Sequence, residues 1–262
     1  MIAGQRFAQR FRAPLFAQFF VLGPVLMASA LAVASDGSIA SGQDGQNRCA
    51  VLLHGLARTS RSMQPVGDSL RAAGWQVVNQ GYPSRSEPVE TLSKAVGAGF
   101  ERCLALGVPA ERIDFVTHSM GGILLRQWVH DTGTTFGRAV MLGPPNNGSE
   151  LVDRIGNTIL FRTYNGPAGS QLGTDDNAIW RRLPRVSFEL GVIAGFGEEH
   201  GFLGRHVAAP NDGKVSVAST RVDGMSDHLA LRAGHTFMMN NVEIHRQIRQ
   251  FLLHGRFVHD AA

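Results

Sequence analysis

The chain has 262 residues, of which 44% are hydrophobic, and a formal net charge of +4. Its length suits one α/β domain, with or without a leader. Three arginines near the start (Arg6, Arg10 and Arg12) have no acidic neighbours before residue 35, so the rest of the chain holds 22 basic side chains against 21 acidic ones. This balance, without a basic stripe interleaved with aromatic residues, argues against nucleic acid as a partner.

Residues 1–34 are predicted to be a cleaved signal peptide. The arginines precede an uncharged run over residues 13–34, whose last three residues, Ala-Val-Ala, are typical of a cleavage site. We therefore expect export to the periplasm or the medium. The alternative is a membrane anchor formed by residues 13–34, because about 20 uncharged residues can span a bilayer. Residues 35–47, rich in Gly, Ser, Asp and Gln, are predicted to be a flexible linker.

The remaining residues, 48–262, are predicted to form one domain in which strands and helices alternate. Apolar runs predict strands at 49–53, 75–79, 113–116, 138–142, 188–194 and 228–232. Helical spacing predicts helices at 62–73, 89–106, from Ser119 to His130, and at 241–253. Such alternation favours an α/β fold with a mostly parallel sheet of about six strands and helices on both faces. In these sheets ligands bind beyond the carboxyl ends of the strands.

Ser119 stands between the third predicted strand and the helix after it, in the sequence Thr117-His118-Ser119-Met120-Gly121. A side chain at such a corner stands clear of the sheet edge and lies at a helix N-terminus, where negative charge is favoured. Ser119 is therefore the candidate nucleophile. Thr117 is compact, but its branched Cβ is expected to make a tight corner harder to form.

A serine hydroxyl needs a base to take its proton, and the base needs an orienting carboxylate. His235 follows the last predicted strand, and Asp212 lies in an Asn-Asp-Gly loop, so both are expected at the functional edge. His228 is at the other end of that strand, about 20 Å away if the strand is extended. The remaining competitors for the acid are Asp223, Asp227, Glu198 and Glu199, and His118 is expected to shape the corner rather than to take a proton.

These features together resemble bacterial lipases and esterases of the α/β-hydrolase superfamily, over roughly residues 48–255. The resemblance rests on the runs Val51–Leu56, Thr117–Gly122, Leu142–Leu151, Asn211–Gly213 and Gly234-His235. It implies the α/β-hydrolase fold with a nucleophile elbow, in which Thr117 replaces the usual first glycine, and the family's chain order of serine, acid and histidine. It also implies that the backbone N–H groups of Met120 and Leu56 stabilise the oxyanion. Residues 150–187 would be a short cap insertion, shorter than many lipase lids.

The predicted function is hydrolysis of carboxylic esters through an acyl-enzyme, with Ser119, Asp212 and His235 as the triad. Acyl transfer or thioester cleavage on the same residues is the alternative, and a non-catalytic binding module is a third. The expected partners are small-molecule or lipid esters, with peripheral contact to lipid, and no oligomeric state is predicted. No cofactor or metal is expected. Apolar residues of 150–187 either cap an acyl pocket or simply pack in the core: Ile155, Ile159, Leu160, Phe161, Tyr164, Leu172, Ile179 and Trp180.

Several other residues allow more than one interpretation. Cys49 and Cys103 either form a disulfide or remain two separate buried thiols, and we favour separate thiols as the simpler arrangement. His54 is expected to be a buried structural histidine. Arg58, with Thr59 and Ser60, either lines the mouth of the pocket or is an exposed loop. The run Gly67-Asp68-Ser69-Leu70 spells the signature of GDSL hydrolases, but it lies within a helical pattern, so Ser69 is expected to be a surface or packing residue.

Overall fold

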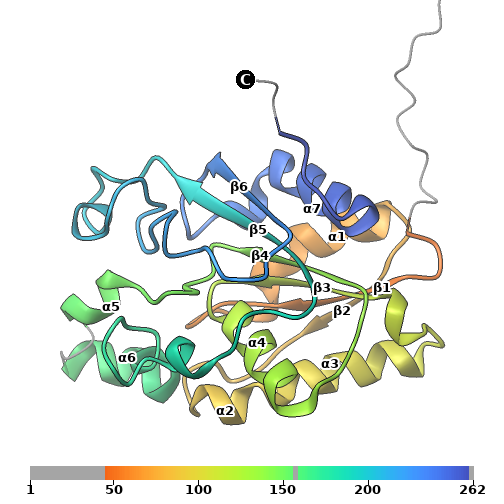
Figure 1. Ribbon diagram of the computed structural model, residues 1–262, viewed down its shortest axis with the longest axis horizontal. Coiled ribbons are helices and arrows are strands. Elements are labelled where there is room, and N and C mark those ends of the chain that lie inside the picture. The colour runs from red at the N-terminus through yellow and green to blue at the C-terminus, as the bar shows by residue number, and fades with distance from the viewer. Residues whose placement is uncertain (1–44, 156–158, 260–262) are drawn as a thin grey trace, which may run out of the picture. The chain divides into compact units, whose positions relative to one another are not determined.

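A parallel sheet of six strands organises the chain in the computed structural model (Figure 1), which describes residues 45–155 and 159–259. The strands are β1 (Cys49–Leu53), β2 (Gln76–Gln80), β3 (Ile113–His118), β4 (Arg138–Leu142), β5 (Glu189–Phe196) and β6 (Asp227–Arg232). Their order is β2-β1-β3-β4-β5-β6, and every neighbouring pair is parallel. The predicted sheet of about six strands is confirmed.

Helices cover both faces of the sheet, as predicted. The helices are α1 (Gln64–Ala72), α2 (Val89–Leu92), α3 (Lys94–Ala105), α4 (Met120–Thr132), α5 (Glu150–Ile155), α6 (Ile159–Ser170) and α7 (Val242–His254). Short 3-10 turns are η1 (Ser60–Met63), η2 (Ala110–Arg112), η3 (Ile179–Arg182), η4 (Gly204–His206) and η5 (Met238–Asn240). Helices α1 and α7 lie on one face, and α2, α3 and α4 lie on the other (Figure 1).

The central strands are buried on both sides, so the core has two parts. Val51 and Leu53 of β1 pack in the cluster under α3 and α4, whereas Ala50 and Leu52 pack in the cluster under α1 and α7. Successive side chains of a strand point to opposite faces, so a strand covered on both sides must be apolar throughout. This is why the apolar runs of the sequence predict β1 and β4 with the bounds that the structure has.

The predicted helix over residues 89–106 is wrong in one respect, because the structure divides it into α2 and α3 at Ser93. The Ser93 hydroxyl donates a hydrogen bond to the backbone carbonyl of Glu90, at 2.9 Å. Serine hydroxyls that bond back to the preceding turn compete with the helical pattern and bend helices. Propensity alone does not show this break, since the dihedral angles of Ser93 remain right-handed helical.

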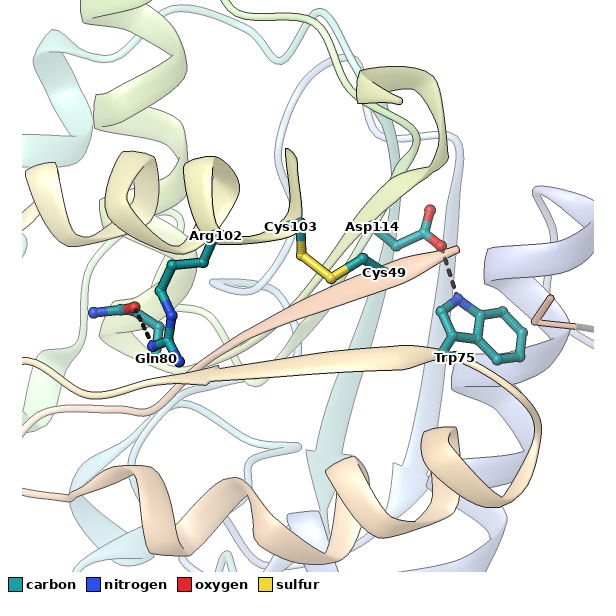
Figure 2. The surroundings of a disulfide bond; sticks show 6 residues. All are labelled: Cys49, Trp75, Gln80, Arg102, Cys103 and Asp114. Atoms are coloured by element: carbon teal, nitrogen blue, oxygen red, sulfur yellow. Dashed lines mark hydrogen bonds between the residues drawn. A yellow bond between two sulfur atoms is a disulfide. The ribbon is translucent and has the colours of Figure 1, made fainter. Parts of the chain in front are cut away.

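Cys49 and Cys103 form a disulfide, with Cα atoms 5.9 Å apart (Figure 2). The favoured prediction of two separate thiols is therefore wrong. The bond joins the first residue of β1 to the buried side of α3, and both cysteines are fully buried. A crosslink that closes a loop of this length removes chain entropy from the unfolded state, worth about 4 kcal/mol on a loop-entropy model.

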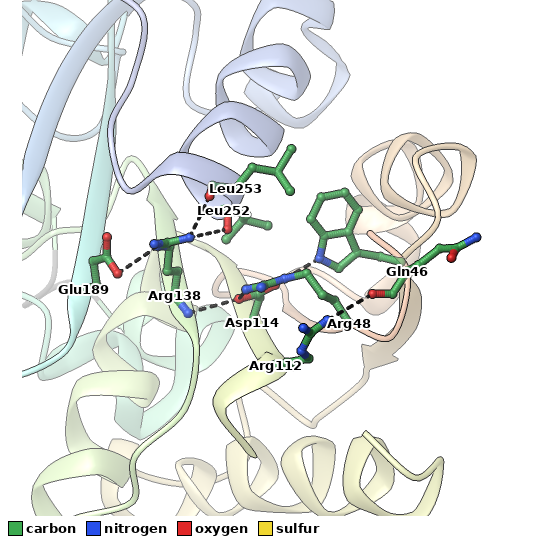
Figure 3. A network of polar contacts seen from close by, with 9 residues as sticks. Gln46, Arg48, Arg112, Asp114, Arg138, Glu189, Leu252 and Leu253 are labelled. Atoms are coloured by element: carbon green, nitrogen blue, oxygen red, sulfur yellow. Dashed lines mark hydrogen bonds and ion pairs between the residues drawn. The ribbon is translucent and has the colours of Figure 1, made fainter. Parts of the chain in front are cut away.

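Asp114 provides a second anchor at the amino end of the sheet (Figure 3). Its carboxylate is fully buried and accepts hydrogen bonds from the Arg48 guanidinium at 2.6 and 2.8 Å, from the Trp75 indole at 3.0 Å and from the Arg138 amide at 3.0 Å. A buried carboxylate is tolerated only when paired and hydrogen-bonded in this way. The charge thus ties β3 to β4, to the residue before β1 and to the residue before β2.

The predicted leader over residues 1–34, and nearly all of the predicted linker, lie outside the described residues. Residues 45–47 form a turn, in which the amide of Gly45 donates to the carbonyl of Ala73 at 3.0 Å. Within 45–155 and 159–259, no helix has the length and apolar character needed to cross a bilayer.

Candidate active site

Ser119 occupies the corner between β3 and α4 with a strained backbone. Its φ of 54° and ψ of −125° lie outside the usual regions for a residue with a side chain, at a cost on the order of 1–3 kcal/mol. Two backbone hydrogen bonds hold it: the Ser119 amide donates to the Leu142 carbonyl at 2.8 Å, and the Gly122 amide donates to the Ser119 carbonyl at 2.9 Å. The chain therefore forms the predicted sharp turn at this serine.

Glycines clear the space around the corner. A Cβ at Gly121 would lie 2.8 Å from the Leu53 carbonyl oxygen, so only glycine lets the start of α4 approach β1 this closely. A Cβ at Gly55 would lie 2.8 Å from the His118 ring and 3.1 Å from the Ser119 Cβ. Thr117 does not hinder the turn as expected, because it is still a regular residue of β3, paired with Leu53 and Met141.

The structure brings Ser119, His235 and Asp212 into one hydrogen-bonded series at the carboxyl edge of the sheet. His235 Nε2 lies 3.0 Å from the Ser119 hydroxyl oxygen, and His235 Nδ1 lies 2.7 Å from Asp212 Oδ2. Asp212 can only accept, so Nδ1 carries the proton, and Nε2 is left free to accept from the serine hydroxyl. All three residues are buried.

The loop that carries Asp212 is shaped to hold its carboxylate still. Asp212 Oδ1 accepts from the amides of Lys214 and Val215 at 3.0 and 2.8 Å, and the amide of His235 donates to the Asp212 carbonyl at 2.9 Å. Glu199 supports the same loop, since its Oε1 accepts from the amide of Asn211 at 3.1 Å. The carboxylate is therefore oriented by backbone groups that cannot easily move.

The competing residues lie elsewhere or have other roles. His228, near the start of β6, pairs with Thr220 at 2.9 Å, and burial lowers its pKa to about 4. Asp227 accepts from the amides of His228 and Phe257, and Asp223 lies in an exposed turn. Ser69 lies on α1, and its hydroxyl accepts from Arg249 of α7. Neither His228 nor Asp227 contacts Ser119.

His118 is buried next to His235. Its Nε2 lies 3.0 Å from the His235 carbonyl oxygen, to which it must donate, and the two ring centroids are 4.8 Å apart. Burial, and then the neighbouring His235, hold the pKa of His118 well below its usual value, so the ring is neutral. The contact holds the backbone of His235, so His118 supports the loop after β6, whereas it was expected to shape the corner.

His54 is a buried structural histidine, as expected. Its ring stacks on Tyr82 at 4.1 Å, its Nδ1 donates to the Gly55 carbonyl at 2.9 Å, and its Nε2 accepts from the Tyr82 amide at 3.4 Å. Burial lowers the pKa of His54, so it too is neutral. The pair braces the loop between β1 and η1.

The two residues whose amides are expected to bind an oxyanion, Leu56 and Met120, follow the paired strands β1 and β3. Met120 is the first residue of α4, and the first amides of a helix have no acceptor within it. Leu56 follows β1, and among the described residues its amide has no hydrogen-bond acceptor. The next residue, Ala57, has a positive φ of 55° and donates its amide to Ser84 Oγ at 3.1 Å, which sets the path of this loop.

A cavity of about 320 Å³ opens above Ser119. Side chains that line it come from the loops after β1, β4, β5 and β6 and from the insertion: Leu56, Arg58, Pro145, Ser149, Leu151, Val152, Leu172, Leu203, Lys214, Val215 and Thr236. Leu151 and Val152 belong to α5, so the insertion helps to form this cavity. Other insertion residues, Ile179 and Leu183, pack in the core. Both interpretations of residues 150–187 therefore apply, to different residues.

Part of the predicted cap insertion lies outside the described residues, and the described part of α6 is interrupted once. The side chains of Ile155, Ile159, Leu160, Phe161 and Tyr164 are outside the described part. Helix α6 is interrupted at Gly166, whose φ of 66° and ψ of −168° are not helical, just before Pro167. In the described residues, no group of three His, Cys, Asp or Glu side chains is placed to hold a metal ion.

Gly143 is a site residue that sequence reasoning missed. It follows β4 with a φ of 54°, and a Cβ there would lie 3.0 Å from Asp212 Oδ2 and 3.2 Å from His235 Nδ1. Glycine at this position therefore lets the acid and the histidine meet above β4. A glycine directly after an apolar strand in such a fold is the only sequence feature that could have suggested it.

No protein-family model matches the sequence, and no curated protein is significantly similar to it. Solved structures do match. The mature lipase BlEst2 of Bacillus licheniformis is 18% identical with a TM-score of 0.65, over 78% of this chain and 91% of that one. The chain has the α/β-hydrolase fold. The metagenome-derived lipolytic enzymes LipS and LipT give a structure with 15% identity and a TM-score of 0.53, over 79% of this chain and 94% of that one.

A third neighbour of the same α/β-hydrolase fold is the phospholipase PlaB of Legionella pneumophila. It is 18% identical, with a TM-score of 0.51, over 66% of this chain and 44% of that one. The fold implied by the sequence resemblance is thus confirmed. In an α/β-hydrolase the loops beyond the carboxyl ends of the strands carry the site, and the cavity above Ser119 lies there.

Proposed function

We propose that this α/β-hydrolase is a serine ester hydrolase that cleaves carboxylic esters through an acyl-enzyme. One observation carries the proposal: a serine at a strained corner, a histidine and a carboxylate form a buried series with distances of 3.0 and 2.7 Å. These are hydrogen-bond distances at which a proton can pass from Ser119 to His235. The lipases among the structural neighbours support the same class of reaction.

In the proposed mechanism, Ser119 Oγ attacks the ester carbonyl while His235 Nε2 takes its proton. Asp212 holds the His235 ring in the required tautomer and stabilises the imidazolium that forms. The amides of Leu56 and Met120 donate to the oxyanion of the tetrahedral intermediate. His235 then gives its proton to the leaving alcohol, and a water molecule, activated by the same ring, releases the acid from Ser119.

The proposed substrates are small-molecule or lipid esters. The cavity of about 320 Å³ has mainly apolar walls, which suits an acyl chain, and its size is within the usual range for ligand pockets. Peripheral contact with lipid would deliver such substrates. Neighbours that are named as a lipase and a phospholipase support lipid esters as a class.

We also propose that the protein is exported. The support is the arginine-led apolar segment over residues 1–34 and the disulfide between Cys49 and Cys103, since disulfides persist mainly in oxidising compartments. Export would place the enzyme where it meets esters from outside the cytoplasm.

Hydrolysis of 4-nitrophenyl butanoate by the mature protein tests the proposed function. We expect Ser119→Ala to lower kcat by at least about 1,000-fold without changing the circular dichroism spectrum, because the nucleophile is lost and the fold is not. Ser69→Ala is the matched control, since this serine lies on α1 away from the cavity. Undiminished turnover by the Ser119→Ala protein would refute the assignment.

A further inference from the structure

Two cationic side chains line the cavity above Ser119 without a carboxylate partner. Arg58 and Lys214 are both half-buried. Every ion pair of the described residues involves other arginines or histidines, so no described carboxylate lies within 4.0 Å of either cation. Cations in a partly dry cleft are costly unless something compensates their charge.

Hydrogen bonds hold the Arg58 guanidinium and the backbone of Lys214. Arg58 lines the cavity, and its Nη2 donates to the Thr236 carbonyl at 3.0 Å. The Lys214 amide donates to Asp212 Oδ1, and the Lys214 carbonyl accepts from the Ser149 hydroxyl at 2.7 Å. The Lys214 ammonium, in contrast, makes no hydrogen bond or ion pair with the described residues.

Nearby acids do not neutralise this pair. Asp212 is engaged by His235 and two amides. Glu198 lines an adjoining hollow together with Lys214, beyond ion-pair distance of it. Burial, followed by repulsion from Arg58, lowers the pKa of Lys214 more than Asp212 raises it. The cavity is therefore positive, although the rest of its wall is largely apolar.

The two cations stand on the side of His235, where the alcohol of an ester must leave. Arg58 binds the residue after His235, and Lys214 lies two residues after Asp212. Lys214, His235 and Thr236 also line the adjoining hollow, which Leu151, Val152 and Leu172 do not reach. In the cavity above Ser119, Leu151, Val152 and Leu172 come from the insertion, whereas the two cations come from the loops after β1 and β5. Because His235 must protonate the leaving oxygen, the alcohol portion of the ester faces the cations.

We propose that Arg58 and Lys214 form a subsite for an anionic group on the alcohol portion of the ester substrate. A phosphate or a carboxylate would satisfy both cations while the acyl chain occupies the apolar wall formed by Leu151, Val152 and Leu172. Arg would bind such a group through its planar fork, and Lys as a point charge. This inference rests on the proposed ester hydrolase function and adds a substrate class to it.

Matched pairs of esters test the subsite. The first pair is the butanoate ester of 4-nitrophenol and that of 5-hydroxy-2-nitrobenzoate, which adds a carboxylate. The second pair is dibutanoylglycerol and dibutanoylglycerol 3-phosphate. The quantity measured is the kcat/KM of the anionic ester divided by that of the neutral ester. A change in the triad that affects the turnover of both esters equally cancels in this ratio.

We expect Lys214→Met to lower the ratio at least about tenfold for one pair or both, and Lys214→Arg to restore most of it. Lys94→Met is the matched control, because Lys94 is the other lysine of the chain and is exposed on α3. Arg58→Gln should act in the same direction, and 0.5 M salt should lower the wild-type ratio. An effect confined to the first pair identifies the anion as a carboxylate, and an effect confined to the second pair identifies it as a phosphate.

An unchanged ratio for both pairs in Lys214→Met and in Arg58→Gln would overturn the subsite. If Lys214→Met does not fold, Arg58→Gln and the salt dependence of the wild type decide the question. The subsite and the function can fail separately. Turnover of the neutral esters that depends on Ser119, without an effect on the ratio, removes only the subsite, whereas no turnover of any ester removes the proposed function.

Discussion

Around Ser119, each neighbouring residue has a separate physical task. Ser119 itself accepts an unfavourable φ, Gly121 allows α4 to approach β1, and Gly55 leaves room for the serine side chain. Thr117 has none of these tasks, because it is a regular strand residue, and β-branched residues suit strands. The elbow motif suggests that each of its small residues is needed. In the structure, close contacts require glycine at Gly55 and Gly121, whereas position 117 accepts a threonine.

Thr117 carries a buried hydroxyl that has no hydrogen-bond partner. Thr117→Val should therefore raise the free energy of unfolding by about 1 kcal/mol, since valine has the same shape and no polar atom to desolvate. Thr220→Val is the matched control, because the Thr220 hydroxyl donates to the Val217 carbonyl at 2.7 Å and its loss should destabilise by about 1 kcal/mol. Urea unfolding measures both. Equal destabilisation by the two changes would contradict this account of Thr117.

At the scale of elements, strands and their following loops were the predictable part. The strands β1 and β4 have the predicted bounds because a strand buried on both faces must be apolar from end to end. The loops that carry Asp212 and His235 were placed at the correct edge by the same reasoning. Helix 89–106 was not predicted correctly, because its break depends on one side-chain hydrogen bond of Ser93.

The end of β4 carries no member of the proposed triad, but it lies against two of them. Gly143→Ala should lower kcat about tenfold or more, because the new Cβ would push on Asp212 and His235, and small misplacements of such groups are costly. Gly133→Ala is the control: it also has a positive φ, of 65°, but nothing lies within 4 Å of its Cβ. Both changes strain the backbone, so stability should fall in both and kcat only in the first.

The kcat values of the two variants are compared per folded molecule, and the folded fraction of each is measured by circular dichroism. A kcat for Gly143→Ala equal to that for Gly133→Ala would mean that the proposed triad tolerates a side chain at this position, and the proposed role of Gly143 would be wrong.

At the scale of the whole molecule, the two stabilising anchors and the candidate active site lie at opposite edges of the sheet. The Asp114 network and the Cys49–Cys103 disulfide secure the amino ends of the strands (Figures 2 and 3), and the cavity occupies the carboxyl ends. The sequence left the disulfide as one of two alternatives and gave no sign of the Asp114 network, because each anchor depends on how α3 or a distant arginine packs against β1 and β3. The charge of the cavity was equally hidden, since Arg58 and Lys214 are far apart in the chain.

Covalent labelling by a fluorophosphonate, followed by mass analysis of peptides, tests the central claim most directly. It does not depend on knowing the natural ester. The account predicts one adduct, on the peptide that contains Ser119, and a rate of labelling at least about 1,000-fold lower in His235→Ala, because the serine loses its base. An unlabelled protein that is folded, or an adduct on another serine with Ser119 unmodified, would contradict the account.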